Sequence, residues 1–338
     1  MPRVRFAPSP TGSLHIGNAL SAVANRNFGG AMLLRIDDTD PARNVPGGEE
    51  ALLDDLRWLG VEWDEGPVRA SERAERHRRA AAEFPQRFGG VMLCRDDGSP
   101  TYHLASVVDE IDFGITHVIR GNDHRPNEAL HRALHEALGT RPPEYVHHGL
   151  VLGADGKKLS KRAQGATVAS LRDEGIPGEA VREYLDELGL PRHDVRLDLP
   201  RIRSLAVDVL ARLPDEELAA RVGVPASVAP ALRGAHSLVE ARELAASILE
   251  APDVPRDNLS PDERARVTLE RFRELREGAN GSLDKDAARA IIRELKAVGG
   301  DLRTVRRALT GRDSGPELWA IVAALPRDET LRRIDAAL

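Results

Sequence analysis

Apolar residues in the first 190 positions form short runs that alternate with helical patterns. The runs have the length and composition of β-strands, and they cover residues 4–6, 32–36, 91–94, 116–120 and 150–152. Between them lie amphipathic stretches such as residues 49–60, in which the leucines at 52, 53, 56 and 59 lie on one face. Strands that alternate with helices are typical of a parallel sheet, so this region predicts an α/β fold.

The pattern changes after residue 190, where the β-like runs stop. Proline, glycine and asparagine breakers then separate helical patterns, and they fall at residues 214, 223–225, 252–255 and 280–281. The length of 338 residues also exceeds what a single core usually needs. The sequence therefore predicts a parallel-sheet α/β domain over residues 1–190, followed by an all-α helical domain over residues 191–338.

Two polar segments of the first domain carry candidate chemistry. The first, RFAPSPTGSLHIGN at residues 5–18, predicts a strand, a turn and a helix start. Backbone N–H groups would there face one anionic site together with Ser9, Thr11 and His15. The second, DGKKLSKR at residues 155–162, is a glycine turn with three lysines and predicts a cationic loop able to close over a polyphosphate. Together the segments predict a nucleotide pocket.

Composition and charge restrict the function only weakly. The formal net charge of −6 gives no global attraction to a polyanion, so any nucleic-acid contact would depend on local basic patches. Cys94 is the only cysteine, which excludes an intramolecular disulfide and a multi-cysteine zinc cluster. Because long apolar runs, a leader pattern and heptads are missing from the sequence, we expect a soluble cytoplasmic monomer without membrane contact.

In this order, the two segments resemble the two signatures of class I aminoacyl-tRNA synthetases, and specifically those of the glutamyl-tRNA synthetase family. Further matching stretches lie between them in the family's order: RIDDTD at 35–40, SER at 71–73, DGSPTYHLASVVDE at 97–110 and GITHVIRGNDH at 114–124. The resemblance implies a Rossmann-like catalytic domain that joins glutamate to ATP, with Mg²⁺ arriving on the nucleotide. It also implies transfer of the glutamyl group to the 3′ end of tRNA(Glu).

The resemblance assigns roles to residues of both signatures. His15 would donate to a phosphate oxygen of ATP, while Lys158 and Lys161 would neutralise the pyrophosphate as it leaves. Gly17 would let the adenosine approach the helix backbone closely. The expected ATP contacts are Thr11, His15, Gly17, Leu159, Ser160 and Lys161.

The same resemblance predicts how the amino acid is held. Arg5 and Arg120 would bracket its side-chain carboxylate with help from Tyr102, because guanidinium groups bind a carboxylate bidentately and suit an amide poorly. Both arginines end apolar runs, at the edge where parallel sheets bind ligands. The complete predicted set is Arg5, Ser9, Asp37, Tyr102, Ser106, Arg120 and Asp123.

Three of these positions depart from the family pattern. Asp37 stands where the family has a glutamate that holds the substrate α-ammonium group, whereas Ser106 and Asp123 replace the usual asparagine and glutamate. The departures therefore concern the α-amino end of the substrate. The carboxylate clamp, which consists of Arg5 and Arg120 with Tyr102, is intact. Of the acidic run at 37–40, only Asp37 is expected to reach substrate. Asp38 and Asp40 should fix the loop through Arg35, Arg43 and backbone donors.

A large insertion of the family is nearly missing. Residues 72 and 102 are only 30 positions apart, where the family has a subdomain that grips the acceptor end of the tRNA, sometimes with zinc. We place the reduced insertion near residues 85–97 and expect no structural zinc. The helix expected at 71–84 carries a basic cluster, in which the candidate tRNA contacts are Arg73, Arg76 and Arg79.

The end of the chain resembles the helical anticodon-binding domain of the same family, with LTG at 309–311 and SGP at 314–316 as the recognisable turn. Arg307 and Arg312 are candidate tRNA contacts there. Two other functions stay open at this point. One is a ligase of the same fold that adenylates glutamate and passes it to a thiol, an amine or a carrier protein, which the missing insertion favours. The other is a catalytically weak RNA-binding paralogue, which the complete set of signature residues opposes.

Overall fold

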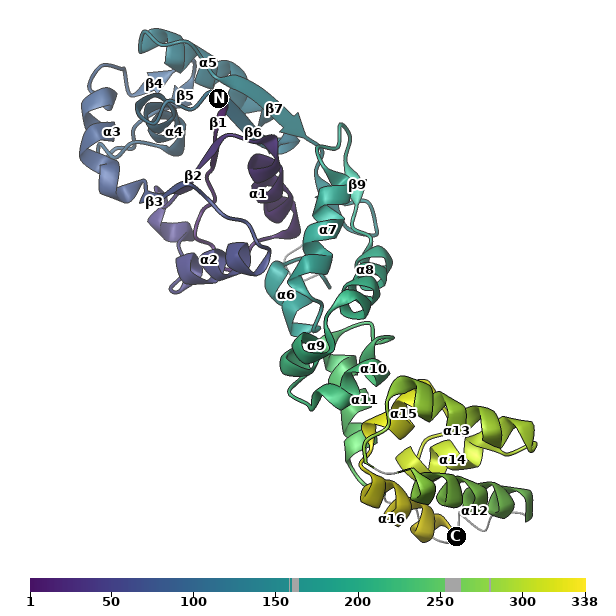
Figure 1. Ribbon diagram of the computed structural model, residues 1–338. Coiled ribbons are helices and arrows are strands. Elements are labelled where there is room, and N and C mark those ends of the chain that lie inside the picture. Colours follow the sequence, from purple (N-terminus) through teal and green to yellow (C-terminus); the bar gives the residue numbers. More distant parts are fainter. Residues whose placement is uncertain (158, 160–163, 253–262, 280) are drawn as a thin grey trace. The chain divides into compact units, whose positions relative to one another are not determined.

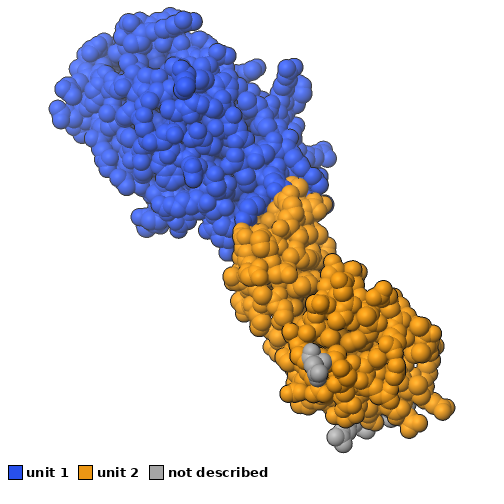
Figure 2. Space-filling view, in the orientation of Figure 1, with its two compact units in different colours: residues 1–173, 178–202 blue, residues 174–177, 203–338 orange. Residues whose placement is uncertain are grey.

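The computed structural model describes residues 1–338 except residues 158, 160–163, 253–262 and 280. Two compact units divide the chain, residues 1–173 with 178–202 and residues 174–177 with 203–338 (Figures 1 and 2). The sequence pattern placed the limit near residue 190. The structure keeps residues 191–202 with the first unit, because β9 (Val195–Arg196) pairs with β8 (Val151–Leu152).

The first unit is built on a five-stranded parallel sheet in the order β3-β2-β1-β6-β7 (Figure 1). Its strands are β1 (Arg3–Phe6), β2 (Ala31–Ile36), β3 (Glu65–Arg69), β6 (His117–Gly121) and β7 (Glu144–His148). The chain adds strands outward from β1 to β3 and then returns to the other side of β1 with β6. The strand order therefore reverses between β1 and β6, and open α/β sheets bind ligands at the carboxyl ends of such a reversal.

The predicted parallel α/β architecture is confirmed, although not every strand was found from the sequence. The runs at 4–6, 32–36 and 116–120 form β1, β2 and β6. The other two runs lie outside the main sheet, because β5 (Val91–Met92) pairs antiparallel with β4 (Arg87–Phe88), and β8 pairs with β9. Strands β3 and β7 were missed, since their sequences EGPVR and EYVHH are polar and only partly buried.

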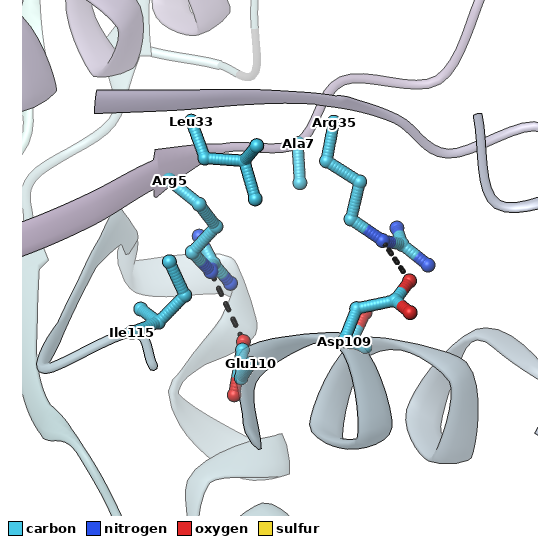
Figure 3. Close-up of a pocket in the computed structure, with 8 residues that line it drawn as sticks. Arg5, Ala7, Leu33, Arg35, Asp109, Glu110 and Ile115 are labelled. Carbon is cyan, nitrogen blue, oxygen red and sulfur yellow. Dashed lines mark hydrogen bonds and ion pairs between the residues drawn. The ribbon is translucent and has the colours of Figure 1, made fainter. Parts of the chain in front are cut away.

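Helices pack against the sheet. Helix α1 (Ile16–Phe28) packs on β1 and β6, and α4 (Tyr102–Asp112) lies over side chains from β1 and β2 (Figures 1 and 3). The remaining helices and helical turns of this unit are η1 (Pro41–Arg43), α2 (Gly48–Trp58), η2 (Ser71–Arg73), α3 (Ala74–Ala81), η3 (Asn122–Asn127), α5 (Glu128–Ala137), α6 (Val168–Asp173) and α7 (Gly178–Leu188). Helix α8 (Leu199–Arg212) begins in the first unit and continues into the second.

The described secondary-structure elements of the second unit are all helices, as predicted. Its elements are α9 (Asp215–Val222), η4 (Ala226–Val228), α10 (Ala229–Leu232), α11 (Leu238–Leu249), α12 (Glu263–Gly278), α13 (Lys285–Ala297), α14 (Leu302–Thr310), α15 (Leu318–Ala324) and α16 (Arg327–Ala337). One cluster of aliphatic side chains with Phe272 forms its core. In the part of the chain that the structure describes, every helix is too short or too polar to cross a bilayer.

Candidate active site

The first signature lies at the carboxyl end of β1, beside the strand reversal. His15 is the N-cap of α1, and its Nδ1 accepts a hydrogen bond from the N–H of Gly17 at 3.3 Å. The ring proton is therefore on Nε2, which donates to the carbonyl oxygen of Leu159 at 3.0 Å. The histidine of the first signature thus contacts the backbone of the second.

Backbone hydrogen bonds also join the first signature to residues 166–168, which follow the second signature in the chain. His15 and Thr167 form an antiparallel bridge, flanked by 2.9 Å bonds from Ile16 N–H to the Ala166 carbonyl and from Val168 N–H to the Leu14 carbonyl. The predicted contacts Lys158, Ser160 and Lys161 lie outside the described residues, whereas the side chain of Leu159 is described and buried. The turn that carries His15 is therefore in contact with Leu159 and with the segment after the lysine loop.

A buried carboxylate holds this turn in place. Asp55 on α2 is 1% exposed and accepts hydrogen bonds from Ser13 Oγ at 2.6 Å and from Leu14 N–H at 2.7 Å. Arg172 of α6 donates to its other oxygen at 2.8 Å, and Ser13 Oγ accepts from Ala169 N–H at 3.0 Å. Burial raises the pKa of Asp55 despite these hydrogen bonds.

The sequence interpretation missed Asp55, although a signal was present. Asp55 lies with Leu52, Leu56 and Leu59 on one helical face, at a spacing of three or four residues. An aspartate on the apolar face of an amphipathic helix has to find buried donors or lose stability. Its position on that face therefore indicated a structural partner elsewhere in the fold.

The predicted clamp residues Arg5 and Arg120 lie on the neighbouring strands β1 and β6, and they are only 8% and 7% exposed. Burial, and next the charge of Arg5, lowers the pKa of Arg120, so the two guanidinium groups share one environment. Arg5 Nε donates to Glu110 Oε1 at 3.0 Å (Figure 3). Among the described residues, Arg120 has no carboxylate within ion-pair distance, and its buried Nη2 has no hydrogen-bond partner.

A small pocket lies between strands β1 and β2 and helix α4 (Figure 3). It is lined by Arg5, Ala7, Leu33, Arg35, Ser106, Asp109, Glu110 and Ile115. Arg35 Nε donates to Asp109 Oδ2 at 2.7 Å, parallel to the pair between Arg5 and Glu110. Burial opposes ionisation, but a hydrogen bond from His77 holds the pKa of Asp109 at about 2, and the charge of Arg5 holds that of Glu110 at about 2. Both carboxylates are therefore ionised.

Tyr102 and Asp37 lie near the arginine pair. Burial raises the pKa of the Tyr102 hydroxyl, and the charges of Arg120, Asp37 and Arg5 also act on it. Asn127 donates to that hydroxyl. Asp37 lies 3.4 Å from Arg35, and its N–H donates to the carbonyl of Pro8 at 2.8 Å, which ties it to the first signature. The structure therefore brings Arg5, Arg120, Tyr102 and Asp37 together.

The other predicted substrate contacts lie around this group. Ser106 is buried on α4 and lines the pocket, and Asp123 lies in η3 directly after β6. Ser9 and Thr11 are in the turn after β1, where Thr11 N–H donates to the Ser9 carbonyl at 2.8 Å. Their contacts with substrate, like that of Gly17, stay predictions.

Asp38 and Asp40 accept hydrogen bonds from backbone donors, as expected, but do not pair with Arg35. Asp38 accepts from the N–H of Ser71 at 2.8 Å and also from its hydroxyl, while Asp40 accepts from Ala42 N–H at 3.3 Å and caps η1. Arg35, which was expected to bind them, contacts Asp37 and Asp109 instead.

The basic cluster near residues 71–84 is largely neutralised by carboxylates. Arg73 donates to Asp109 at 2.6 Å, and Arg76 makes two 2.9 Å hydrogen bonds to Asp112. Arg79 is exposed, and no ion pair joins it to any described residue. Of the three predicted tRNA contacts on this helix, Arg79 is therefore the one whose charge is not offset.

The two arginines predicted on the second unit differ in the same way. Arg307 makes two 2.9 Å hydrogen bonds to Asp313, which also binds Arg303 at 2.8 Å. Arg312 is exposed, and no described carboxylate pairs with it. Its guanidinium therefore keeps its full charge at the surface of this unit.

Comparison with known proteins assigns both units. The sequence profile of the tRNA synthetases class I (E and Q), catalytic domain, matches residues 2–87 and 83–202, and that of the anticodon binding domain matches residues 205–338. The chain belongs to this class I synthetase family. The catalytic profile matches in two segments that overlap at residues 83–87, next to the place predicted for the reduced insertion.

Individual relatives align with almost the whole length of this chain. A glutamate–tRNA ligase of Rubrobacter xylanophilus is 35% identical over 420 aligned positions, which include 99% of this chain and 97% of the relative. One of Methylorubrum extorquens is 32% identical, with 98% and 97% covered. A crystal structure of a glutamate tRNA ligase from Elizabethkingia meningosepticum, in complex with its amino acid, has a TM-score of 0.76 at 23% identity and 99% coverage of both chains, which shows the shared fold.

Proposed function

We propose that this synthetase activates L-glutamate with ATP and transfers it to the 3′ end of tRNA(Glu). The similarity to relatives that are named glutamate–tRNA ligases supports this proposal. The observation that carries the proposal is the position of Arg5 and Arg120. Both are buried cations on the two strands between which the sheet order reverses, beside the turn of His15. A glutamate carboxylate fits these donors, whereas an amide would leave them poorly satisfied.

In the first step, an oxygen of the substrate α-carboxylate attacks the α-phosphorus of ATP, and the bond to pyrophosphate breaks. The Nε2 proton of His15 stabilises charge on a phosphate oxygen in place of its present bond to Leu159. Lys158 and Lys161 neutralise the pyrophosphate. In the second step, a ribose hydroxyl of the tRNA attacks the acyl carbon, and AMP leaves.

Mg²⁺ arrives with ATP in this proposal. The described residues contain no group of three or more His, Cys, Asp or Glu side chains able to hold a metal ion. When bound, Mg²⁺ would be held by the phosphates of the nucleotide and would neutralise part of their charge. We further propose that the enzyme acts as a monomer.

The test is ATP–pyrophosphate exchange with glutamate, run with and without tRNA and followed by a charging assay. We expect exchange when tRNA is present, together with glutamyl-tRNA formation. Absence of exchange in both samples would refute glutamate activation. Exchange without any charging of tRNA would instead select the ligase with another acceptor.

A second prediction concerns tRNA binding by the first unit. Arg78 and Arg79 are exposed on α3, whereas Arg76 is bound by Asp112. Reversing both exposed charges (Arg78→Glu with Arg79→Glu) should raise the Kd for tRNA about 10-fold and lower the slope of log affinity against log salt by about 1–2. Filter binding at several salt concentrations measures this, with Arg141→Glu as the exposed control. An unchanged slope would remove α3 from the tRNA interface.

A further inference from the structure

Two histidines, rather than a carboxylate, hold the guanidinium group of Arg120. Arg120 Nε donates to Nε2 of His147 at 3.3 Å, and its Nη1 lies 3.5 Å from Nδ1 of His131. His147 is on β7, which pairs with the strand of Arg120, and His131 is on α5. Because a guanidinium group can only donate, both of these ring nitrogens act as unprotonated acceptors.

The second nitrogen of each ring has its own partner. His131 Nε2 lies 3.1 Å from Nδ1 of His103, so it carries the ring proton and donates it there. His147 Nδ1 lies 3.5 Å from Glu128 Oε2 and carries its proton toward that carboxylate. Burial and the charge of Arg120 lower the pKa of His131 to about 3 and that of His147 to about 4. Both rings are therefore neutral, with one tautomer each.

Arg5 and Arg120 consequently differ in their net charge environment. Arg5 is paired with the ionised Glu110, and that pairing offsets its charge. Arg120 has neutral acceptors on two of its nitrogens and the ring of Tyr145 at 5.0 Å. Its third nitrogen, Nη2, is buried without a hydrogen-bond partner among the described residues. A buried donor of this kind is costly to the free enzyme unless a ligand satisfies it.

We propose that His131 and His147 are positioning residues that orient Arg120 and leave its full charge available to the side-chain carboxylate of the substrate. A carboxylate at either place would orient the guanidinium equally well but would offset its charge and weaken the selection of an acid over an amide. This inference rests on the proposed function, because it needs a substrate with a side-chain carboxylate. Beyond that function, the inference identifies His131 and His147 as the residues that keep the charge of Arg120 uncompensated.

The experiment compares three kinds of variant at these two positions. His147→Gln and His131→Asn place an amide oxygen where the accepting ring nitrogen lies, and so keep a neutral acceptor. His147→Leu and His131→Leu remove the acceptor. His147→Glu keeps an acceptor but adds a negative charge. The KM values for glutamate and ATP, kcat, and the ratio of kcat/KM for glutamate over glutamine are measured in the exchange assay with tRNA present.

The leucine variants should raise the KM for glutamate about 10- to 30-fold and change the KM for ATP and kcat less than about 3-fold. The amide variants should return the KM for glutamate to within about 3-fold of the wild-type value. His147→Glu should lower the glutamate-to-glutamine ratio about 10-fold or more. His117→Gln, at the opposite end of β6, is the matched control and should leave all four quantities unchanged.

Several outcomes would overturn the inference. Equal losses in the amide and leucine variants, or equal increases in the KM values for glutamate and ATP, would indicate a purely structural role. A glutamate-to-glutamine ratio in His147→Glu equal to that in His147→Gln would show that charge at this position does not matter, and this comparison holds even where the leucine variants fail to fold. A wild-type enzyme without glutamate-dependent exchange would contradict the proposed function itself.

Discussion

Arg120→Ala is expected to lower kcat/KM for glutamate by about 100- to 1,000-fold, the effect of removing a buried, charge-assisted partner of a carboxylate. Most of the loss should appear in the KM for glutamate, because Arg120 would bind the side-chain carboxylate of the substrate, away from the α-phosphorus of ATP that reacts. The ratio of kcat/KM for glutamate over glutamine should fall about 10-fold or more. Exchange kinetics with both amino acids, in the presence of tRNA, measure these quantities.

Arg120 is a cleaner position for this test than Arg5. Removing Arg5 would take the guanidinium away from Glu110, which is ionised and only 3% exposed, so folding stability would suffer together with binding. Arg120 has only neutral acceptors, so its removal leaves no described carboxylate unpaired. The thermal midpoint of Arg120→Ala should therefore stay close to the wild-type value. Undiminished selection against glutamine would exclude Arg120 from the clamp.

Structural features that depend on neighbouring residues in the chain were predictable from the sequence. The strand, turn and helix start around His15 depend on neighbours in the chain, and so do the apolar runs of β1 and β6 that end near Arg5 and Arg120. The meeting of those two arginines followed from one further rule, that parallel strands present their carboxyl ends at the same edge. The confirmed fold rests on such local signals.

Features that depend on partners distant in sequence were not predictable. Arg5 and Glu110 are 105 positions apart, and Arg73 and Asp109 are 36 apart, so spacing gave no sign that these arginines would be neutralised. The same holds for the histidines beside Arg120, which come from α5 and β7. β7 was itself unrecognised, because the glutamate and the two histidines in EYVHH interrupt its apolar pattern.

His15 has two roles that one substitution can separate. Its Nδ1 caps α1 by accepting from Gly17 N–H, and its Nε2 reaches the backbone of the lysine loop. Asparagine keeps an acceptor for the cap but has no group that reaches as far as Nε2, whereas alanine removes both. Loss of an N-cap typically costs about 1 kcal/mol of stability, and asparagine is among the best caps.

His15→Asn should therefore lower kcat about 100- to 1,000-fold, the usual effect of removing one donor to a charged transition state, while the KM for glutamate changes less than about 3-fold. Its thermal midpoint should lie within about 2 °C of the wild-type value. His15→Ala is the matched comparison: the same loss of kcat, with a further loss of stability. Exchange kinetics and thermal unfolding of both variants provide the data. If His15→Asn keeps the wild-type kcat, the imidazole acts only as a helix cap, and the charge on the phosphates has to be stabilised by other groups.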